Sequence, residues 1–442
     1  MKQVTVIGGG LAGCEAALTL ADRGVSVRLI ESKPLRRSAA HASDDMCELV
    51  CSNSLKSNDP ATAHGLLKAE LRVMGSKVLA AADECAVPAG SALAVDRKRF
   101  SALVTERVRA ESNITIINET AEDIPDGLVI VATGPLTLAP LDGRIAKLFG
   151  SLHFFDAEAP IISADSVDMS KAYHAARYGK GDDTDYLNCP LTREEYDAFY
   201  DALISAERAD LHEFEKGEIF EGCMPVEVMA ARGRDSLRFG PMRPVGLRAP
   251  DGTRPYAVLQ LRKENVAGDM YNLVGFQTNL KFPEQKRVFG LIPALAHAEF
   301  LRYGVMHRNT FIDAPKVLDS CFRVGRDGRI FVAGQLSGVE GYVESICSGH
   351  LAALHAAAVL SGREPLPPPD VCMSGALSGY VSSPNDDFQP MNANFGLLPP
   401  LSEHVRDKSE RKRLMSQRAL DAIKKYTESY IQWRSEVQPS LP

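Results

Sequence analysis

The sequence lacks any long hydrophobic run, internal repeat or low-complexity tract. No apolar stretch in its 442 residues reaches the roughly 20 residues that a membrane span requires. Met1-Lys2 lead directly into an apolar strand, which leaves no room for a signal peptide. Hydrophobic residues make up 45% and charged residues 24% of the chain, as in globular proteins that bury a core. We therefore predict a cytoplasmic protein without a membrane-spanning segment.

Paired cysteine motifs are also missing. The nine cysteines are odd in number, and none forms the C-x-x-C spacing of structural zinc sites. This pattern argues against both a disulfide framework and a metal centre, and it favours a reducing compartment. We expect no metal in the site and make no prediction of the oligomeric state.

The chain has no overall excess of positive charge, because its formal net charge is −7. This net charge argues weakly against a nucleic-acid partner. The stretch from 232 to 263 differs, because it holds eight basic residues against two acidic ones, interleaved with glycine and proline. Such a pattern is typical of loops that contact phosphates. A second basic stretch, from Arg406 to Lys425, is interpreted as the solvated face of a helix.

A complete dinucleotide fingerprint opens the chain. The apolar strand Val4–Ile7 leads into a G-x-G-x-x-G turn and a helix of good helix formers, and a second apolar run ends at an acid eighteen residues after the last glycine. The glycines permit a tight turn and close approach of a pyrophosphate, and the acid can bind ribose hydroxyls. An acid there disfavours a 2′-phosphate, and therefore NADP. The predicted cofactor contacts in this unit are Gly8, Gly10, Leu11, Ala12, Gly13 and Glu31.

Two later segments favour FAD over NAD. Leu128–Gly134 is a buried strand ending in Ala-Thr-Gly, and Arg329–Gln335 is another that ends in Ala-Gly and precedes a helix rich in small residues. Two-dinucleotide-fold flavoproteins carry both elements, although many have an aspartate where this chain has Gln335. The predicted contacts in these segments are Thr133, Gly134, Gly334, Gln335, Tyr342 and Glu344.

The fold class predicted from this order is α/β, a two-dinucleotide-binding-type (Rossmann-like) FAD domain interrupted by an inserted α+β domain. We predict the first part of the FAD domain at residues 1–154, an inserted substrate- or RNA-binding domain at 155–290, the second part of the FAD domain at 291–400 and a helical tail at 401–442. Within the first part, we predict a helical stretch over Gly65–Ala82, and apolar spacing predicts a helix over Asp96–Glu111.

Two cysteines lie in segments suited to chemistry. Cys51 follows a short apolar run and precedes a polar turn, and Cys223 follows a glycine and lies two residues before a proline. Exposed cysteines near cations or backbone amides can form reactive thiolates. The alternative interpretation of each is a small buried hydrophobic residue.

Seven segments, in order along nearly the whole chain, resemble the folate- and FAD-dependent tRNA (uracil-5-)-methyltransferase family. They are Val6–Ala17, Leu49–Leu55, Pro88–Arg97, Phe220–Glu227, Tyr271–Leu280, Gly334–Tyr342 and Asp387–Pro400. The two cysteine segments and the late Asn-Ala-Asn-Phe-Gly stretch are far more specific than the glycine turn. Lys33–His41 is a looser match, because the family commonly reads Thr-Pro-Ala-His at its end.

The resemblance implies a reaction. Cys223 would add to uracil C6 and so make C5 nucleophilic. Reduced FAD would carry the methylene group of 5,10-methylenetetrahydrofolate to C5, with NADH or NADPH as the reductant. Cys51 would act near the flavin, with removal of the C5 proton as one plausible role. Tyr342 would stack on pterin or flavin, or serve only as a partly buried aromatic.

The predicted function is therefore formation of 5-methyluridine in the T-loop of tRNA. The same chemistry on ribosomal RNA is a close alternative, and a relative of the longer flavoproteins that modify wobble uridine is another. A non-catalytic RNA-binding flavoprotein would not need Cys51 and Cys223. A generic NAD(P)H–flavin oxidoreductase would not need the basic stretch at 232–263.

Overall fold

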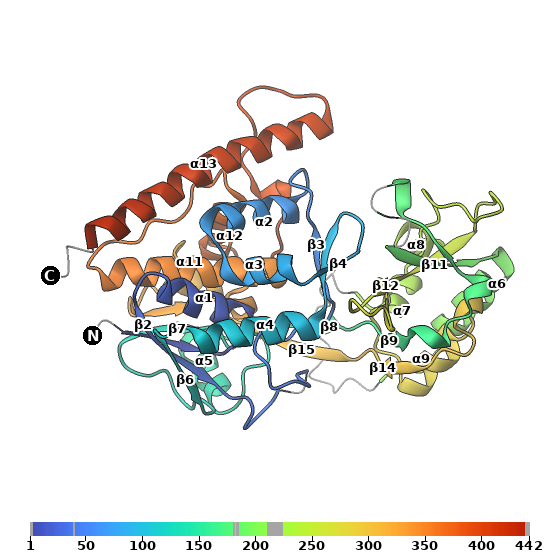
Figure 1. The fold of residues 1–442 in the computed structure, drawn as a ribbon, viewed down its shortest axis with the longest axis horizontal. Helices are drawn as coiled ribbons and strands as arrows, with labels where there is room; N and C mark the ends of the chain where they lie inside the picture. The colour runs from blue at the N-terminus through green and yellow to red at the C-terminus, as the bar shows by residue number, and fades with distance from the viewer. Residues whose placement is uncertain (1–2, 39, 180–181, 183–184, 210–223, 438–442) are drawn as a thin grey trace.

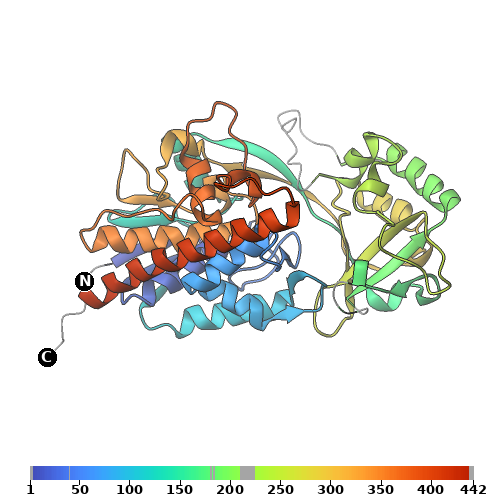
Figure 2. The same ribbon diagram turned by 90° about the horizontal axis from the view of Figure 1, so that it is seen from above.

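The computed structural model describes residues 3–38, 40–179, 182, 185–209 and 224–437. A larger body, which holds both ends of the chain, lies beside a smaller body built from the middle of the sequence (Figures 1 and 2). This arrangement agrees with the predicted α/β fold class, in which an inserted α+β part interrupts a dinucleotide-binding domain.

A five-stranded parallel sheet is the centre of the larger body. Its strands lie in the order β16-β7-β1-β2-β6, and their apolar residues are mostly buried. The strands are β1 (Gln3–Ile7), β2 (Ser26–Glu31), β6 (Ile114–Asn118), β7 (Leu128–Val131) and β16 (Ile330–Val332). β1 pairs with β2 on one side and with β7 on the other, so the chain order reverses at β1. Ligands of open α/β sheets bind at the carboxyl ends of the strands at such a reversal.

Two apolar helices, α1 (Leu11–Ala21) and α11 (Tyr342–Leu360), pack closely against each other beside this sheet. The close approach of α11 to α1 requires a glycine at position 349, because a Cβ on Gly349 would lie 2.2 Å from the carbonyl oxygen of Ala12. α11 has the length and composition of a membrane-spanning helix, but 78% of its most apolar window is buried in the fold. Its apolar surface is therefore used in the protein core.

The helical stretch predicted over Gly65–Ala82 consists of two helices, α2 (Ala63–Met74) and α3 (Lys77–Glu84). Gly75 takes a left-handed φ of +82° and ends α2, and the Ser76 side chain then caps α3. The helix predicted over Asp96–Glu111 is confirmed as α4 (Arg97–Ala110), with Asp96 as its N-cap. A small antiparallel sheet lies beside these helices and contains β3 (Ser54–Ser57), β4 (Ala86–Val87) and β5 (Ala92–Val95).

The smaller body is built on a six-stranded antiparallel sheet in the order β10-β11-β12-β13-β9-β14. Its strands are β9 (Ile161–Ser163), β10 (Tyr173–His174), β11 (Tyr186–Leu191), β12 (Ala257–Lys263), β13 (Met270–Leu273) and β14 (Phe300–Arg302). Its helices are α6 (Arg193–Ser205), α7 (Val226–Ala231), α8 (Ser236–Phe239) and α9 (Phe282–Phe289). Buried aromatic side chains, among them Phe199, Phe276 and Phe289, form a separate core.

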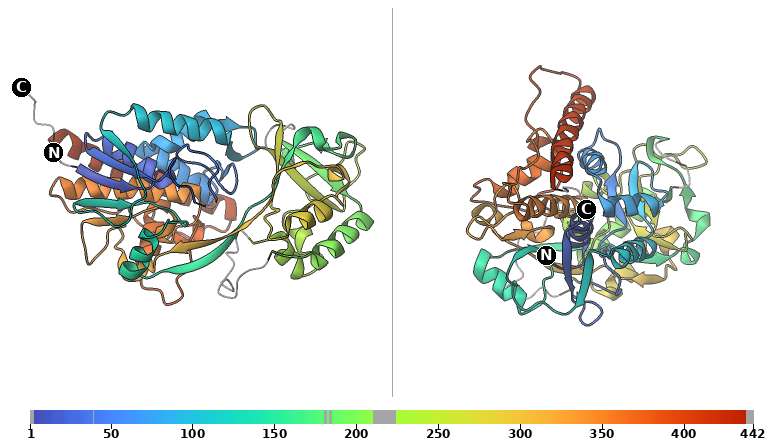
Figure 3. Two further views of the ribbon diagram at one scale, coloured as in Figure 1. Left: turned by 90° about the horizontal axis from the view of Figure 1, so that it is seen from below. Right: turned by 60° about the vertical axis from the view of Figure 1, so that its left-hand side comes forward.

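The two bodies are joined by β8 (Leu152–Ala157) and β15 (Met306–Phe311), which pair along their full length (Figure 3). These strands carry the chain into the smaller body and back again. The sheet of the smaller body extends to Arg302, past the predicted limit at 290. The bounds of the four predicted segments stay predictions.

On the larger body, the long helix α13 (Lys408–Val437) lies along α2 (Figure 1). α12 (Met373–Ser382) also packs on α2. The buried Glu70 carboxylate of α2 accepts the backbone N–H groups of Met373 and Ser374 at 2.7 and 2.9 Å. A carboxylate from one helix therefore satisfies the N-terminal amides of another.

Candidate functional site

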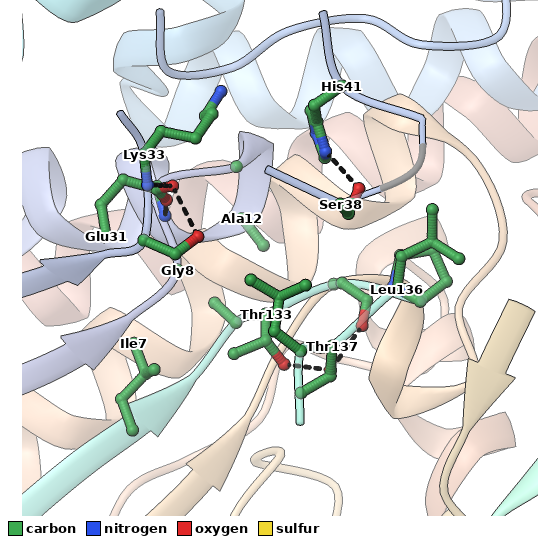
Figure 4. A pocket seen from close by; sticks show the side chains of 18 of the residues that line it. Ile7, Gly8, Ala12, Glu31, Lys33, Ser38, His41, Thr133, Leu136 and Thr137 are labelled. Atoms are coloured by element: carbon green, nitrogen blue, oxygen red, sulfur yellow. Dashed lines mark hydrogen bonds between the residues drawn. The ribbon is translucent and has the colours of Figure 1, made fainter. Parts of the chain in front are cut away.

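A pocket opens at the carboxyl ends of the parallel strands, beside the start of α1 (Figure 4). Ten of the twelve residues predicted to contact a cofactor line it: Gly8, Gly10, Leu11, Ala12, Glu31, Thr133, Gly134, Gly334, Gln335 and Tyr342. They come from three segments far apart in the sequence. The fold therefore brings the early fingerprint and the two late segments together.

The glycine turn has the close packing that its sequence predicts. Gly8 has a φ of +103°, and a Cβ on Gly13 would lie 1.8 Å from the carbonyl oxygen of Gly8. Gly13 thus acts by packing and does not line the pocket. Gly10 is different, because a Cβ there would meet no atom within 4 Å. Since no side chain caps the start of α1, its amide end faces open space suited to a pyrophosphate.

Glu31 ends β2 with a carboxylate that is 7% exposed. One of its oxygens accepts the Gly9 N–H at 2.5 Å, and the other accepts the Lys33 N–H at 2.8 Å. These amides fix the carboxylate at the pocket wall. A fixed anion there suits ribose hydroxyl donors and repels a phosphate.

The opposite wall comes from the ends of β7 and β16. The Thr133 and Thr137 hydroxyls lie 2.6 Å apart, and Gly134 has a left-handed φ of +70°. Gly334 donates its N–H to Ser348 Oγ at 2.8 Å, which ties the end of β16 to α11. The Gln335 side-chain amide donates to Glu340, so the side chain that replaces the common aspartate is held in place.

Tyr342 joins the pocket to Cys51. Its side chain lines the pocket, and its hydroxyl accepts the N–H groups of Cys51 and Ser52 at 2.8 and 3.1 Å. Burial raises the pKa of Tyr342 well above its ordinary range, so the phenol stays neutral. The Cys51 thiol is partly exposed. Cys223 lies outside the described residues, so its predicted role stays a prediction.

Glu344 is buried and does not line the pocket. Its carboxylate accepts the Ala393 N–H at 2.9 Å and lies 3.4 Å from His64 Nε2. Burial raises the pKa of this carboxyl. Glu344 therefore anchors the Asn-Ala-Asn-Phe-Gly stretch to the first turn of α11, and its predicted cofactor contact stays a prediction.

Several residues that line the pocket were not predicted from the sequence, among them Lys33, Ser38 and His41. His41 Nδ1 lies 2.6 Å from Ser38 Oγ, and a dashed line marks this contact in Figure 4. Burial and, secondarily, the Lys33 charge lower the pKa of His41. Only the loose match of Lys33–His41 to the family pointed to this wall. Among the residues that the structure describes, no three His, Cys, Asp or Glu side chains gather as a metal site.

The basic stretch at 232–263 is not one uniform surface. Arg234 pairs with Asp197 and Asp201 at 2.6 and 2.5 Å, and Arg238 lies over the Tyr256 ring. Arg262 is 6% exposed, so the interpretation of this arginine as a surface phosphate contact is wrong. Three exposed arginines of the stretch form no ion pair with any described residue, and they are Arg243, Arg248 and Arg254.

Comparison with known proteins identifies the family. The model of the glucose inhibited division protein A family matches residues 3–364. The methylenetetrahydrofolate–tRNA-(uracil-5-)-methyltransferase TrmFO of Bacillus cereus strain ATCC 14579 is 53% identical over 427 residues, which are 96% of this chain and 98% of that protein. The TrmFO of Bacillus anthracis strain CDC 684 is also 53% identical over the same shares.

Two solved structures share the fold, both of Aquifex aeolicus GidA. The form II crystal structure has a TM-score of 0.70 at 16% identity, and the match covers 97% of this chain and 73% of that one. The form I structure has a TM-score of 0.70 at 17% identity, covering 97% and 76%. At 53% identity over nearly its full length, this chain belongs to the methylenetetrahydrofolate–tRNA-(uracil-5-)-methyltransferases of the glucose inhibited division protein A family.

Proposed function

We propose that this protein forms 5-methyluridine in tRNA, with FAD as the bound cofactor and 5,10-methylenetetrahydrofolate as the carbon donor. The names of the relatives that are 53% identical support the tRNA substrate, the uracil C5 position and the folate donor. One observation carries the proposal. Tyr342 lines the dinucleotide pocket and its hydroxyl accepts the backbone N–H of Cys51, which holds the Cys51 segment beside a cofactor site.

The pocket residues fit FAD. The open space at Gly10 and the uncapped start of α1 would hold the pyrophosphate, and Glu31 would hold the adenosine ribose. Thr133, Gly334 and Gln335 would lie along the flavin half. The chemistry that bound FAD supplies is two-electron reduction and carriage of a one-carbon unit, with NADH or NADPH as the source of electrons.

The residues of this chain have complementary parts in the reaction. The Cys223 thiolate adds to uracil C6, which turns C5 into a nucleophile, and it leaves once the C5 proton has been removed. Cys51 is the candidate for removing that proton. Tyr342 is a neutral donor and acceptor that holds the Cys51 backbone at the pocket. The target is a uridine of the T-loop.

A reconstituted assay tests the proposal. The purified protein is incubated with FAD, methylenetetrahydrofolate, NADH or NADPH, and unmodified tRNA, with unmodified ribosomal RNA in a parallel reaction. We expect 5-methyluridine at one T-loop position of tRNA, and none when the folate is omitted. Product in ribosomal RNA alone would establish the alternative target, and product in neither RNA would refute the methyltransferase assignment.

A further inference from the structure

The Cys51 segment, residues 49–53, lies between the two bodies of the protein. On one side the Tyr342 hydroxyl binds its backbone N–H groups at Cys51 and Ser52. On the other side lie Arg97, the first residue of α4, Arg262 of β12, and Glu264, which directly follows that strand. The smaller body therefore contacts the segment that carries the thiol.

Arg97 binds the carbonyl side of the segment. Its Nη1 donates to the Leu49 carbonyl at 3.0 Å, and its Nη2 donates to the Cys51 carbonyl at 3.4 Å. The Arg97 Nε lies 2.6 Å from Oε2 of Glu264, a carboxylate that is 2% exposed. Although burial opposes the charge, Glu264 raises the pKa of Arg97. The guanidinium thus stays charged in the interior because the smaller body supplies its counter-ion.

Arg262 binds the side chains of the same segment. Its Nε donates to Asn53 Oδ1 and its Nη2 donates to Ser52 Oγ, both at 2.8 Å. The Asn53 amide in turn donates to the carbonyls of Lys263 and Val95 at 2.9 and 3.1 Å. Asn53 is fully buried, and both ends of its side-chain amide are hydrogen-bonded. A planar two-donor fork of this kind fixes orientation as well as distance.

These contacts are an unusual way to join two bodies. Burying charges is costly, and apolar residues of similar volume often give equal or greater stability. The bonds of Arg97 and Arg262 end on the backbone and side chains next to Cys51, and they hold both sides of that residue. Their geometry therefore sets the place of the thiol relative to Tyr342 and the pocket.

We propose that Arg97, Arg262 and Glu264 are positioning residues for the reaction, through which the β12 strand of the smaller body holds the Cys51 thiol in place for catalysis. The inference rests on the proposed role of Cys51. It makes the smaller body part of the active site, because removal of its fork or its carboxylate would loosen one of the two sides from which the Cys51 segment is held.

The principal variant is Arg262→Lys, which keeps the charge and most of the volume but cannot form the two-donor fork. Glu264→Gln is the second variant, since it removes the counter-ion of Arg97 at constant size. The matched control is Asp185→Asn. Asp185 joins the same two bodies by accepting the Gly90 N–H at 2.7 Å, and it has no contact with the Cys51 segment.

We expect Arg262→Lys to lower kcat for tRNA methylation by on the order of tenfold to 100-fold, as small misplacements of reacting groups do. FAD content, flavin reduction by NADPH and the KM for tRNA should stay within about twofold of wild type. Alkylation of Cys51 by iodoacetamide, followed by peptide mass spectrometry, should become faster because the segment is held less firmly. Asp185→Asn should match wild type in each measurement.

A kcat for Arg262→Lys within about twofold of wild type would overturn the inference. So would an equal loss in Asp185→Asn, which would indicate a general docking contact, or an unchanged rate of Cys51 alkylation. If Arg262→Lys fails to fold, the same criteria apply to Glu264→Gln. A wild-type protein that makes no 5-methyluridine would refute the proposed function instead, so the two failures are distinguishable.

Discussion

At the scale of single residues, a substitution at Gly10 should affect FAD binding without affecting the folding of the chain. Its φ of −78° is open to any residue, and a Cβ there meets no protein atom within 4 Å. Gly10→Val should therefore fold but lose FAD, because its side chain fills the space that the pyrophosphate needs. We expect FAD affinity to fall by at least about tenfold, or about 1.4 kcal/mol. Absorbance at the flavin band per mole of protein measures the loss.

Gly13→Val is the informative counterpart. Its Cβ would lie 1.8 Å from the Gly8 carbonyl oxygen, so this variant should lose thermal stability and not only FAD. Thermal unfolding of the two apoproteins distinguishes them. Full FAD occupancy in a folded Gly10→Val protein would contradict the placement of the cofactor.

The two cysteines make a second prediction at this scale. With 5-fluorouridine at the target position, elimination is blocked because fluorine does not leave as a proton does. Wild type should then form a stable protein–RNA adduct, and Cys223→Ala should form none while retaining FAD. Denaturing gel electrophoresis of labelled RNA measures the adduct. Cys51→Ala should keep adduct formation but lose methylation of normal tRNA. Near wild-type methylation by Cys223→Ala would make Cys51 the candidate nucleophile.

At the scale of elements, Glu70 makes the packing of α2 against α12 depend on pH. Burial, opposed by hydrogen bonds from Ser374 and Met373, raises the pKa of this carboxyl from 4.5 to about 7. The folded state therefore binds a proton at Glu70 more tightly than the unfolded chain does. The stability that this gives is fully present below pH 4.5 and is lost as the pH rises through about 7. At about 1.4 kcal/mol per pKa unit, the contribution of Glu70 to the free energy of unfolding changes by about 3 kcal/mol over this range.

Urea unfolding of wild type and Glu70→Gln between pH 4.5 and 7 measures this effect. The difference between their free energies of unfolding isolates Glu70, since the other titrating groups are shared. We expect wild type to lose stability relative to Glu70→Gln as the pH rises. A constant difference would show that the Glu70 carboxyl titrates alike in the folded and unfolded chains.

Elements were predictable where local chemistry decides them. The run Val4–Ile7, the glycine turn and the Asp96 cap all form as their residues require. The break at Gly75 was missed because apolar spacing continues across it, and only the left-handed backbone reveals two helices. Arg97 and Glu264 were missed for another reason. They lie 167 residues apart, and only the docking of the smaller body beside α4 brings Glu264 to Arg97.

At the scale of the whole molecule, the smaller body carries two kinds of arginine that the sequence does not tell apart. Arg262 is buried at the junction, whereas Arg243, Arg248 and Arg254 are exposed. The residue type and its charge are the same in both kinds. Which arginines are buried depends on how the strands pair, and the sequence alone does not show this. The basic stretch therefore predicts a phosphate-binding surface only for its exposed members.

The exposed arginines are therefore expected to contribute to tRNA binding. Replacing Arg243, Arg248 and Arg254 together by glutamine should weaken tRNA binding and reduce the slope of log K against log salt by about one for each phosphate that is no longer neutralised. Arg234→Gln is the matched control, because Asp197 and Asp201 already neutralise Arg234 and its replacement should leave the slope unchanged. Fluorescence anisotropy of labelled tRNA over a salt series measures both variants. Flavin reduction by NADPH should be the same in all three proteins, since the exposed arginines do not line the pocket. If the triple variant keeps the wild-type slope and Arg234→Gln lowers it, tRNA binds across the helix α6 face, where Arg234 lies beside Asp197 and Asp201, and the exposed loop is only solvated surface.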